Sequence, residues 1–94
     1  MIYIIKELCK DNYKIGITKN LKRRLTQLQC GNPDILLINC CYTTTNDRLY
    51  EKHLHSISEK FNIRNEWFKF DKEEINNLKV YITTLENISN DYEL

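Results

Sequence analysis

The chain has 94 residues, of which 41% are hydrophobic and 29% charged, with two glycines and one proline. This composition excludes disordered and collagen-like classes and predicts one globular domain spanning residues 1–94. Fourteen basic residues against thirteen acidic residues give a net charge of +1, so the overall charge predicts no nucleic-acid partner by itself.

No apolar run approaches the roughly 20 residues that cross a bilayer. The apolar start at residues 1–5 has no basic segment before it and is followed by Lys6 and Glu7, which argues against a secretory signal. We therefore expect a soluble, intracellular protein, cytoplasmic or nuclear within a host cell. The four cysteines lack a C-x-x-C spacing, which argues against a disulfide framework or a zinc knuckle.

Residues 1–7 and 13–18 are two β-rich runs joined by a Lys-Asp-Asn turn, which predicts an opening hairpin. Lys14 and Gly16 share one face of the second strand. A glycine weakens a strand, so we expect Gly16 to mark a position where another backbone or a ligand approaches closely.

The next element is a helix over residues 21–29, capped by Asn20. Its helical period places Arg24 beside an apolar stripe of leucines and Arg23 on roughly the opposite side. We therefore expect Arg24 to be held against the sheet and Arg23 to be solvated. The stripe consists of Leu21, Leu25 and Leu28.

A basic cluster of Lys19, Lys22 and Arg23 surrounds the start of this helix. Backbone N–H groups also point outward there, and together these groups suit a phosphate. A solvated helix face explains the same charges equally well.

Residues 35–42 are apolar on both faces, which is typical of a strand covered on both sides, so helices are expected on both faces of the sheet. A second helix is predicted over residues 47–61. Glu51 lies on the flank of its buried stripe, and His55 follows at i+4 on the same flank. That stripe is predicted to contain Leu49, Tyr50, Leu54, Ile57 and Phe61.

Residues 62–65 are expected to form a loop, and residues 66–70 a short extended piece at the edge of the core. Asp71 and Glu74 have the spacing of a capping box that opens a last helix through about residue 88, after which the tail should fray. The predicted order of elements is β-β-α-β-α-(β)-α.

Polar residues in unexpected places suggest a site: they are Tyr3, Lys14, Arg24, Glu51 and His55. A charge at the edge of an apolar stripe is costly unless it is paired or functional, which applies to Arg24 and Glu51. They form either a structural salt bridge between two helices or part of a functional site. No phosphate loop, nucleophile elbow or H-E-x-x-H helix is present, which argues against nucleotide-binding, serine-hydrolase and zincin classes.

Several short motifs occur in one order: I-Y-I at residues 2–4, Y-K-I-G at 13–16, G-N-P at 31–33, E-K-H-L-H at 51–55 and E-W-F at 66–68. This combination, which covers residues 1–70, resembles the GIY-YIG nuclease superfamily, in particular its phage and large-DNA-virus branch. The resemblance implies an α+β fold with a three-stranded antiparallel sheet flanked by three helices. It also implies a DNA endonuclease that hydrolyses phosphodiester bonds with one Mg²⁺ or Mn²⁺.

Carried over position by position, Tyr3 matches the tyrosine of the first motif, Arg24 the helix arginine and Glu51 the metal-binding glutamate. Lys14 replaces the tyrosine expected two positions before Gly16, as in some nucleases that this sequence resembles. Arg24 would then stabilise charge on the scissile phosphate. Tyr3 would accept a proton, which requires a nearby cation, either Lys14 or a metal-bound water, to lower its pKa from about 10. His55 is the rival proton acceptor, or it orients Glu51.

Two alternatives remain open at this point. One is a catalytically inactive GIY-YIG-fold module that binds DNA or another partner, which the near-zero net charge and Lys14 favour. The other is a structural zinc site made by His53, His55 and a cysteine, although His53 is also expected as a half-buried packing residue on its helix.

Overall fold

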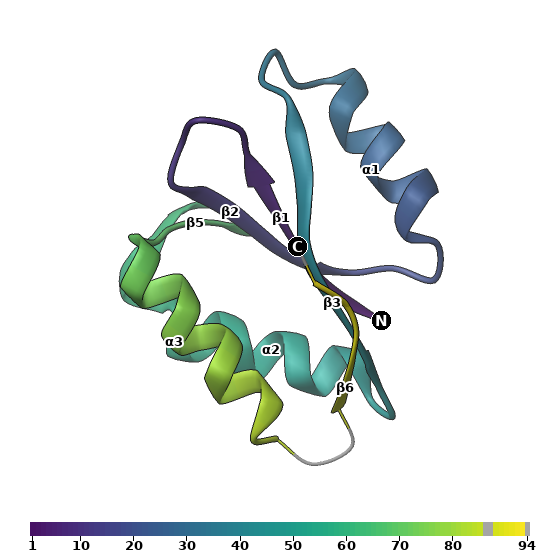
Figure 1. Cartoon of the computed structure of the whole chain (residues 1–94), viewed down its shortest axis with the longest axis vertical. Helices are drawn as coiled ribbons and strands as arrows, with labels where there is room; N and C mark the ends of the chain where they lie inside the picture. Colours follow the sequence, from purple (N-terminus) through teal and green to yellow (C-terminus); the bar gives the residue numbers. More distant parts are fainter. Residues whose placement is uncertain (86–87, 94) are drawn as a thin grey trace.

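The computed structural model describes residues 1–85 and the backbone of residues 88–93. These parts of the chain form an α+β fold whose elements surround one antiparallel sheet (Figure 1). In chain order the elements are β1 (Ile2–Glu7), β2 (Asn12–Ile17), α1 (Leu21–Cys30), β3 (Leu36–Thr44), α2 (Asp47–Ile57), the 3₁₀ turn η1 (Glu59–Phe61), β4 (Asn62–Arg64), β5 (Trp67–Lys69), α3 (Lys72–Thr83) and β6 (Ile88–Glu93).

The sheet is larger than the predicted three strands, because its order in the described residues is β4-β5-β2-β1-β3-β6. The predicted strands β1, β2 and β3 form its centre, and the short strands β4 and β5 extend one edge. Residues 62–65 are therefore not entirely a loop, and the tail that was expected to fray pairs with β3 through residue 93. Strands of three residues are too short to show an alternating pattern, which is why the sequence did not reveal β4.

Helices cover both faces of the sheet, as predicted: α1 lies on one side, and α2 and α3 lie on the other (Figure 1). The side of α2 and α3 holds the larger apolar cluster, which includes Leu54, Phe68 and Phe70. The side of α1 holds a smaller cluster built on Tyr3 and Ile5. The three leucines of the predicted α1 stripe pack against this smaller cluster, together with Trp67.

The predicted helix starts are confirmed by their caps. The Asn20 side chain accepts a hydrogen bond from the Arg23 backbone N–H at 3.0 Å. Asp71 and Glu74 form both hydrogen bonds of a capping box at the start of α3. This last helix ends at Thr83 rather than near residue 88, and residues 86–87 lie outside the described part of the chain.

The inward face of α2 differs from the predicted stripe. Leu54 is fully buried, whereas Leu49 is 58% exposed and Ile57 is 43% exposed. At 100° per residue, Leu49 lies about 140° from Leu54 around the helix, so both cannot face the sheet. The helix also ends at Ile57, and η1 then redirects the chain so that Phe61 packs on the core. None of the helices in the described residues is long and apolar enough to span a membrane.

Candidate functional site

The candidate site lies where the outer edge of β2 loses its partner strand. Strand β5 pairs with β2 only from Asn12 to Lys14, after which the Ile15 N–H donates to the carbonyl oxygen of Glu66 at 3.2 Å. Beyond this point α2 approaches the edge of β2, and His55 Nε2 lies 2.8 Å from the Ile15 carbonyl oxygen. The uncovered edge therefore allows side chains from both faces of the sheet to approach one another.

Tyr3 and Gly16 lie opposite each other on β1 and β2. A Cβ atom at Gly16 would overlap the hydroxyl end of the Tyr3 ring, so only glycine leaves space for this ring. The predicted close approach at Gly16 is thus confirmed, and the approaching group is the Tyr3 side chain. Arg24 Nε donates a hydrogen bond to Tyr3 Oη at 3.3 Å, which links α1 to this position.

The two neighbouring arginines of α1 separate as predicted. Arg24 is half-buried and contacts Tyr3, whereas Arg23 is exposed. Within the described residues no salt bridge joins Arg24 to Glu51, so the structural salt-bridge hypothesis is wrong. Tyr3 engages the Arg24 Nε, and the other guanidinium N–H groups have no hydrogen-bond partner within the described residues.

Lys14 forms an ion pair that the sequence did not reveal. Its Nζ lies 2.8 Å from Glu66 Oε2, and Lys14 is only 7% exposed. The same ammonium lies 5.8 Å from the centroid of the Trp67 ring. Glu66 is the first letter of the E-W-F motif and directly precedes the strand that pairs with Lys14. The motif position of Glu66 could therefore have predicted its contact with Lys14, but only if the pairing of β5 with β2 had been known.

The Glu51 carboxylate is half-buried and has no hydrogen bond or ion pair within the described residues. Burial is the main cause that raises the pKa of Glu51, and the negative charge of Glu66 adds to it. The charges of His55, Lys14 and Arg48 oppose this rise in pKa. Glu51 is therefore an available oxygen donor that lies close enough to the other site residues to feel their charges.

Tyr3 remains a protonated phenol in the isolated protein. Burial raises the pKa of Tyr3 above 10, while the hydrogen bond and positive charge of Arg24 lower it, and Glu66 and Glu51 raise it. The expected lowering of this pKa by Lys14 is not found, because Lys14 is paired with Glu66 and burial dominates. Additional positive charge must therefore lower the pKa of Tyr3, so that the phenol loses its proton, before Tyr3 can act as a proton acceptor.

His55 is fixed in one orientation at the edge of the sheet. Because its Nε2 faces a carbonyl oxygen, this nitrogen carries the proton, and only Nδ1 is left as a proton acceptor. Its ring also packs against Phe68, with 5.2 Å between ring centroids. His53 lies apart from this arrangement, half-buried, with Nε2 at 2.7 Å from Tyr81 Oη.

Oxygen donors for a metal ion are few. Among the described residues there is no group of three His, Cys, Asp or Glu side chains that could hold a metal, which speaks against the structural zinc site. Glu51 alone resembles a magnesium ligand, since Mg²⁺ is commonly held by one or two carboxylates together with water and substrate phosphate. The donor set thus fits a cation that is recruited with a phosphate.

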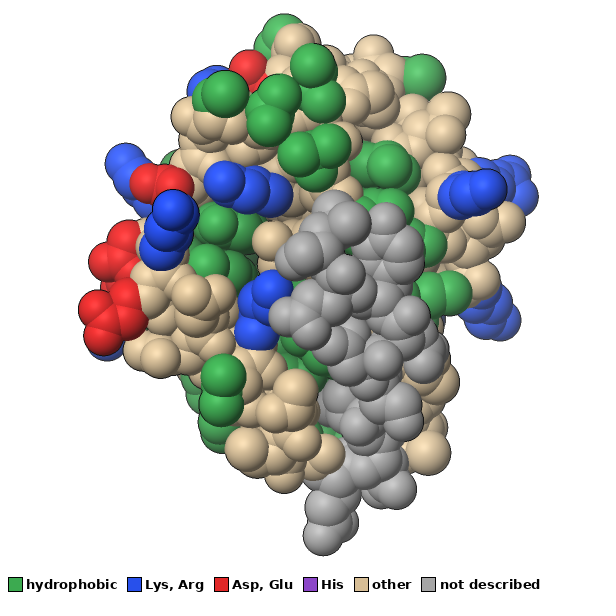
Figure 2. Space-filling model, in the orientation of Figure 1, with side chains coloured by type: hydrophobic (Ala, Val, Ile, Leu, Met, Phe, Trp, Pro, Cys, Tyr) green, Lys and Arg blue, Asp and Glu red, His purple; other side chains and the backbone are tan. Residues whose placement is uncertain are grey.

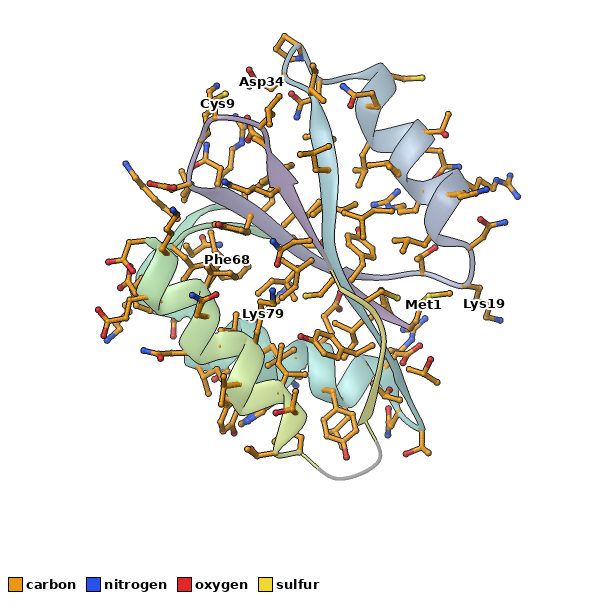
Figure 3. The ribbon with its side chains drawn as sticks, in the orientation of Figure 1. Met1, Cys9, Lys19, Asp34, Phe68 and Lys79 are labelled. Carbon is orange, nitrogen blue, oxygen red and sulfur yellow. The ribbon has the colours of Figure 1, made fainter. Side chains whose placement is uncertain are left out.

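The basic cluster of Lys19, Lys22 and Arg23 is exposed at the start of α1. Figure 2 shows basic side chains along the outer side of this helix, with no acidic side chain beside them in that view. Lys19 projects from the loop that enters α1 (Figure 3), one turn before Arg24. The cluster therefore lies at the same end of α1 as Arg24, with Arg23 on the solvent side of the helix.

Comparison with protein-family models matches residues 1–83 to the T5orf172 domain. This is a phage-associated domain related to nucleases of the GIY-YIG and HNH types. No curated protein and no solved structure gives a significant match. The matched range contains every candidate site residue named above, from Tyr3 on β1 to Glu66 before β5.

Proposed function

The chain belongs to the T5orf172 domain family, and we propose on this basis that it is a metal-dependent endonuclease that hydrolyses DNA phosphodiester bonds. The family indicates a phage nuclease-like or DNA-binding function. One observation carries the proposal further: Tyr3, Arg24 and Glu51 come from three different elements, and their charges and contacts meet at one edge of the sheet. We assign this activity to a single GIY-YIG-like catalytic domain spanning residues 1–94.

Glu51 is the residue that would hold Mg²⁺ or Mn²⁺. Its carboxylate has no direct partner in the described residues, and its pKa is raised by burial, which means that a nearby cation would stabilise its charged form. When bound, such a cation supplies Lewis acidity and neutralises charge at the scissile phosphate.

Arg24 would bind the scissile phosphate. Its Nε is held by Tyr3, which orients the guanidinium, and its terminal N–H groups remain for two phosphate oxygens. Charge that develops on these oxygens during hydrolysis would be stabilised by a group that is already in place. Lys19, Lys22 and Arg23 would contact neighbouring phosphates along the backbone of DNA.

Two groups are candidates for the proton acceptor. Tyr3 has its hydroxyl beside Arg24, but burial keeps it protonated until more positive charge arrives. His55 has only Nδ1 available, because its Nε2 donates to the Ile15 carbonyl oxygen. Lys14 would act beside them as a positive charge whose distance from the substrate is set by Glu66.

The second candidate function is a DNA-binding or interaction module that retains the fold without cleavage. It is favoured by one observation, namely that Lys14 is neutralised by Glu66 and does not lower the pKa of Tyr3. In such a module Glu51→Gln would leave DNA affinity equal or tighter, because an anion near phosphates is removed. Either function would place the work of the protein inside a host cell, where DNA is accessible.

Cleavage of supercoiled plasmid by the purified protein tests the proposal. We expect nicking with Mg²⁺ or Mn²⁺ at low salt, none with a chelator, and at least a hundredfold loss in Glu51→Gln. Glu59→Gln is the matched control, because Glu59 is an exposed glutamate in η1 away from the site. DNA binding without cleavage by both the parent protein and Glu51→Gln would favour the binding module.

A further inference from the structure

A polar cavity of about 350 Å³ opens at the hairpin end of the sheet. It is formed by the end of β1, the start of β2, the loop after α1 and the strands β4 and β5. Figure 3 shows this end of the molecule, where Asp34 and Cys9 lie near each other and far from Lys19. Its lining includes Glu7, Asn12, Asn32, Pro33, Asp34, Arg64 and Trp67.

Glu7 is the unusual member of this lining, since it is a glutamate only 6% exposed. Asn12 Nδ2 lies 3.5 Å and Lys10 Nζ 3.7 Å from its carboxylate oxygens. Burial and a side-chain hydrogen bond with the Asp34 carboxyl group raise the pKa of Glu7. Lys10 is engaged more closely by Asp34, at 2.7 Å. A buried carboxyl group beside a second acidic side chain is costly, and a fold retains it more readily when a ligand supplies hydrogen-bond donors.

The remaining walls suit a flat, polar-edged molecule. Trp67 and Pro33 provide apolar surface, Asn12 and Asn32 provide amides, and Arg64 provides an exposed cation on β4. An aromatic surface for stacking, combined with hydrogen-bonding groups at the edge, is the chemistry that recognises an unpaired nucleobase. The cavity is also too polar for a purely apolar ligand.

The cavity and the candidate active site lie on the same face of the sheet. Glu7 follows Tyr3 by four residues along β1, so their Cα atoms are separated by about 13 Å. Trp67 lies between them, because it pairs with Lys14 and its ring also lines the cavity. A nucleotide chain whose phosphate contacts Arg24 could therefore place a nearby base in this cavity.

We propose that the cavity binds the guanine base of an unpaired nucleotide close to the cleavage position, and so determines which DNA is cut. A carboxylate offers two acceptor oxygens, and guanine offers two adjacent N–H donors on its Watson–Crick edge. Thymine instead presents a single N–H flanked by carbonyl oxygens, which the Glu7 carboxylate would repel. This inference rests on the proposed nuclease function, and it gives the G-N-P and E-W-F motifs a shared site.

Trp67 makes the test direct, because it is the one tryptophan in the sequence and its fluorescence reports on this cavity. The protein is titrated with dGMP, dTMP and deoxyribose 5-phosphate in the presence of a chelator, so that no cleavage occurs. We expect the dissociation constant from Trp67 quenching to be at least about tenfold lower for dGMP than for dTMP, because a side chain that makes two hydrogen bonds to one base discriminates by about that factor. The same titration is repeated with a thymine oligonucleotide that carries one central guanine, both as a single strand and as a duplex. Binding of the single strand but not of the duplex would show that the cavity takes an unpaired base within DNA, and binding of dGMP alone would show that it takes a free nucleotide.

Glu7→Gln should abolish the preference for dGMP, because one acceptor oxygen becomes a donor, whereas Glu73→Gln on the exposed face of α3 should retain it. Circular dichroism of Glu7→Gln checks its folding. If this variant does not fold, Arg64→Ala provides the test on an exposed side chain and should weaken dGMP at least about threefold.

Equal quenching by all three ligands would overturn the proposal, since it would show that Trp67 senses only phosphate near Lys14. An unchanged preference in Glu7→Gln, or an unchanged affinity for dGMP in Arg64→Ala when it has to be used, would overturn it as well. Metal-dependent cleavage without guanine-selective quenching would leave the nuclease standing and remove the base site. Guanine-selective quenching without cleavage would support the base site and contradict the nuclease.

Discussion

The two sides of the sheet differ in what they bury. On the side of α2 and α3, fully buried apolar side chains form a continuous core, and α3 alone contributes Ile75, Leu78 and Ile82. On the side of α1 the helix itself has no fully buried residue, and the sheet buries the polar groups of Tyr3 and Lys14. We therefore expect the side of α2 and α3 to supply most of the stability, while the side of α1 tolerates buried polar groups that are costly but that a site requires.

Shortening one leucine on each side of the sheet should give the largest difference in stability. Leu54→Ala removes a fully buried side chain of the larger cluster and should lower the free energy of unfolding by about 3 kcal/mol. Leu25→Ala removes a half-buried side chain of α1 and should cost about 1 kcal/mol. Urea denaturation of both variants measures the difference, and equal costs would show that the two sides share the stability evenly.

Gly16→Ala tests how tightly the α1 side holds its polar groups. The new methyl group would overlap the Tyr3 ring, so Tyr3 must move away from Arg24. We expect a loss of about 1–3 kcal/mol in stability and at least a tenfold loss of cleavage. Gly31→Ala is the control for stability, because a Cβ at Gly31 meets no atom within 4 Å. Normal cleavage by Gly16→Ala would remove Tyr3 from the mechanism.

The two neighbouring arginines of α1 separate the effects of a half-buried and an exposed positive charge. Arg24→Lys retains the charge but loses the fork that spans Tyr3 and a phosphate, so the rate at saturating DNA should fall at least tenfold. Arg23→Ala should leave that rate nearly unchanged and should instead weaken DNA binding. The slope of log affinity against log salt concentration should fall by about the value of one phosphate contact. Steady-state cleavage at several salt concentrations separates the two effects. The reverse pattern would contradict the predicted faces of α1.

The smallest effect concerns the pH dependence of stability. The folded state raises the pKa of Glu51 above 4.5, chiefly by burial, so the folded protein binds this proton more tightly than the unfolded chain. Stability from this group is therefore present below pH 4.5 and is lost as the pH rises through the folded pKa. Glu51→Gln should not show this loss.

The matching measurement is thermal unfolding of Glu51→Gln and the parent protein from pH 3 to pH 8. We expect the melting temperature of the variant to be higher by about 2 °C at neutral pH and equal at acidic pH. A lower melting temperature of the variant at neutral pH would mean that Glu51 forms a stabilising contact rather than an energetically costly one.

Local patterns in the sequence predicted much of this architecture. The helical period separated Arg24 from Arg23, and the strand position of Gly16 predicted a close approach, because both depend only on residues nearby in the chain. Strands β4 and β6 and the role of Glu66 depend instead on pairings between distant segments. Lys14 and Glu66 are 52 positions apart, so no local period connects them. The exposed Leu49 shows that hydrophobicity alone does not fix a helix face.

The ion pair between Lys14 and Glu66 also determines when the site can assemble during protein synthesis. Strands β1 and β2 leave the ribosome first, together with Tyr3 and Arg24, but the partner of Lys14 follows only when β5 has been made. A nascent chain therefore carries most of the site residues long before they form a site. If the finished protein cuts DNA, translation that stops before residue 66 releases a fragment without an assembled site, so cleavage would begin only after β5 has been made.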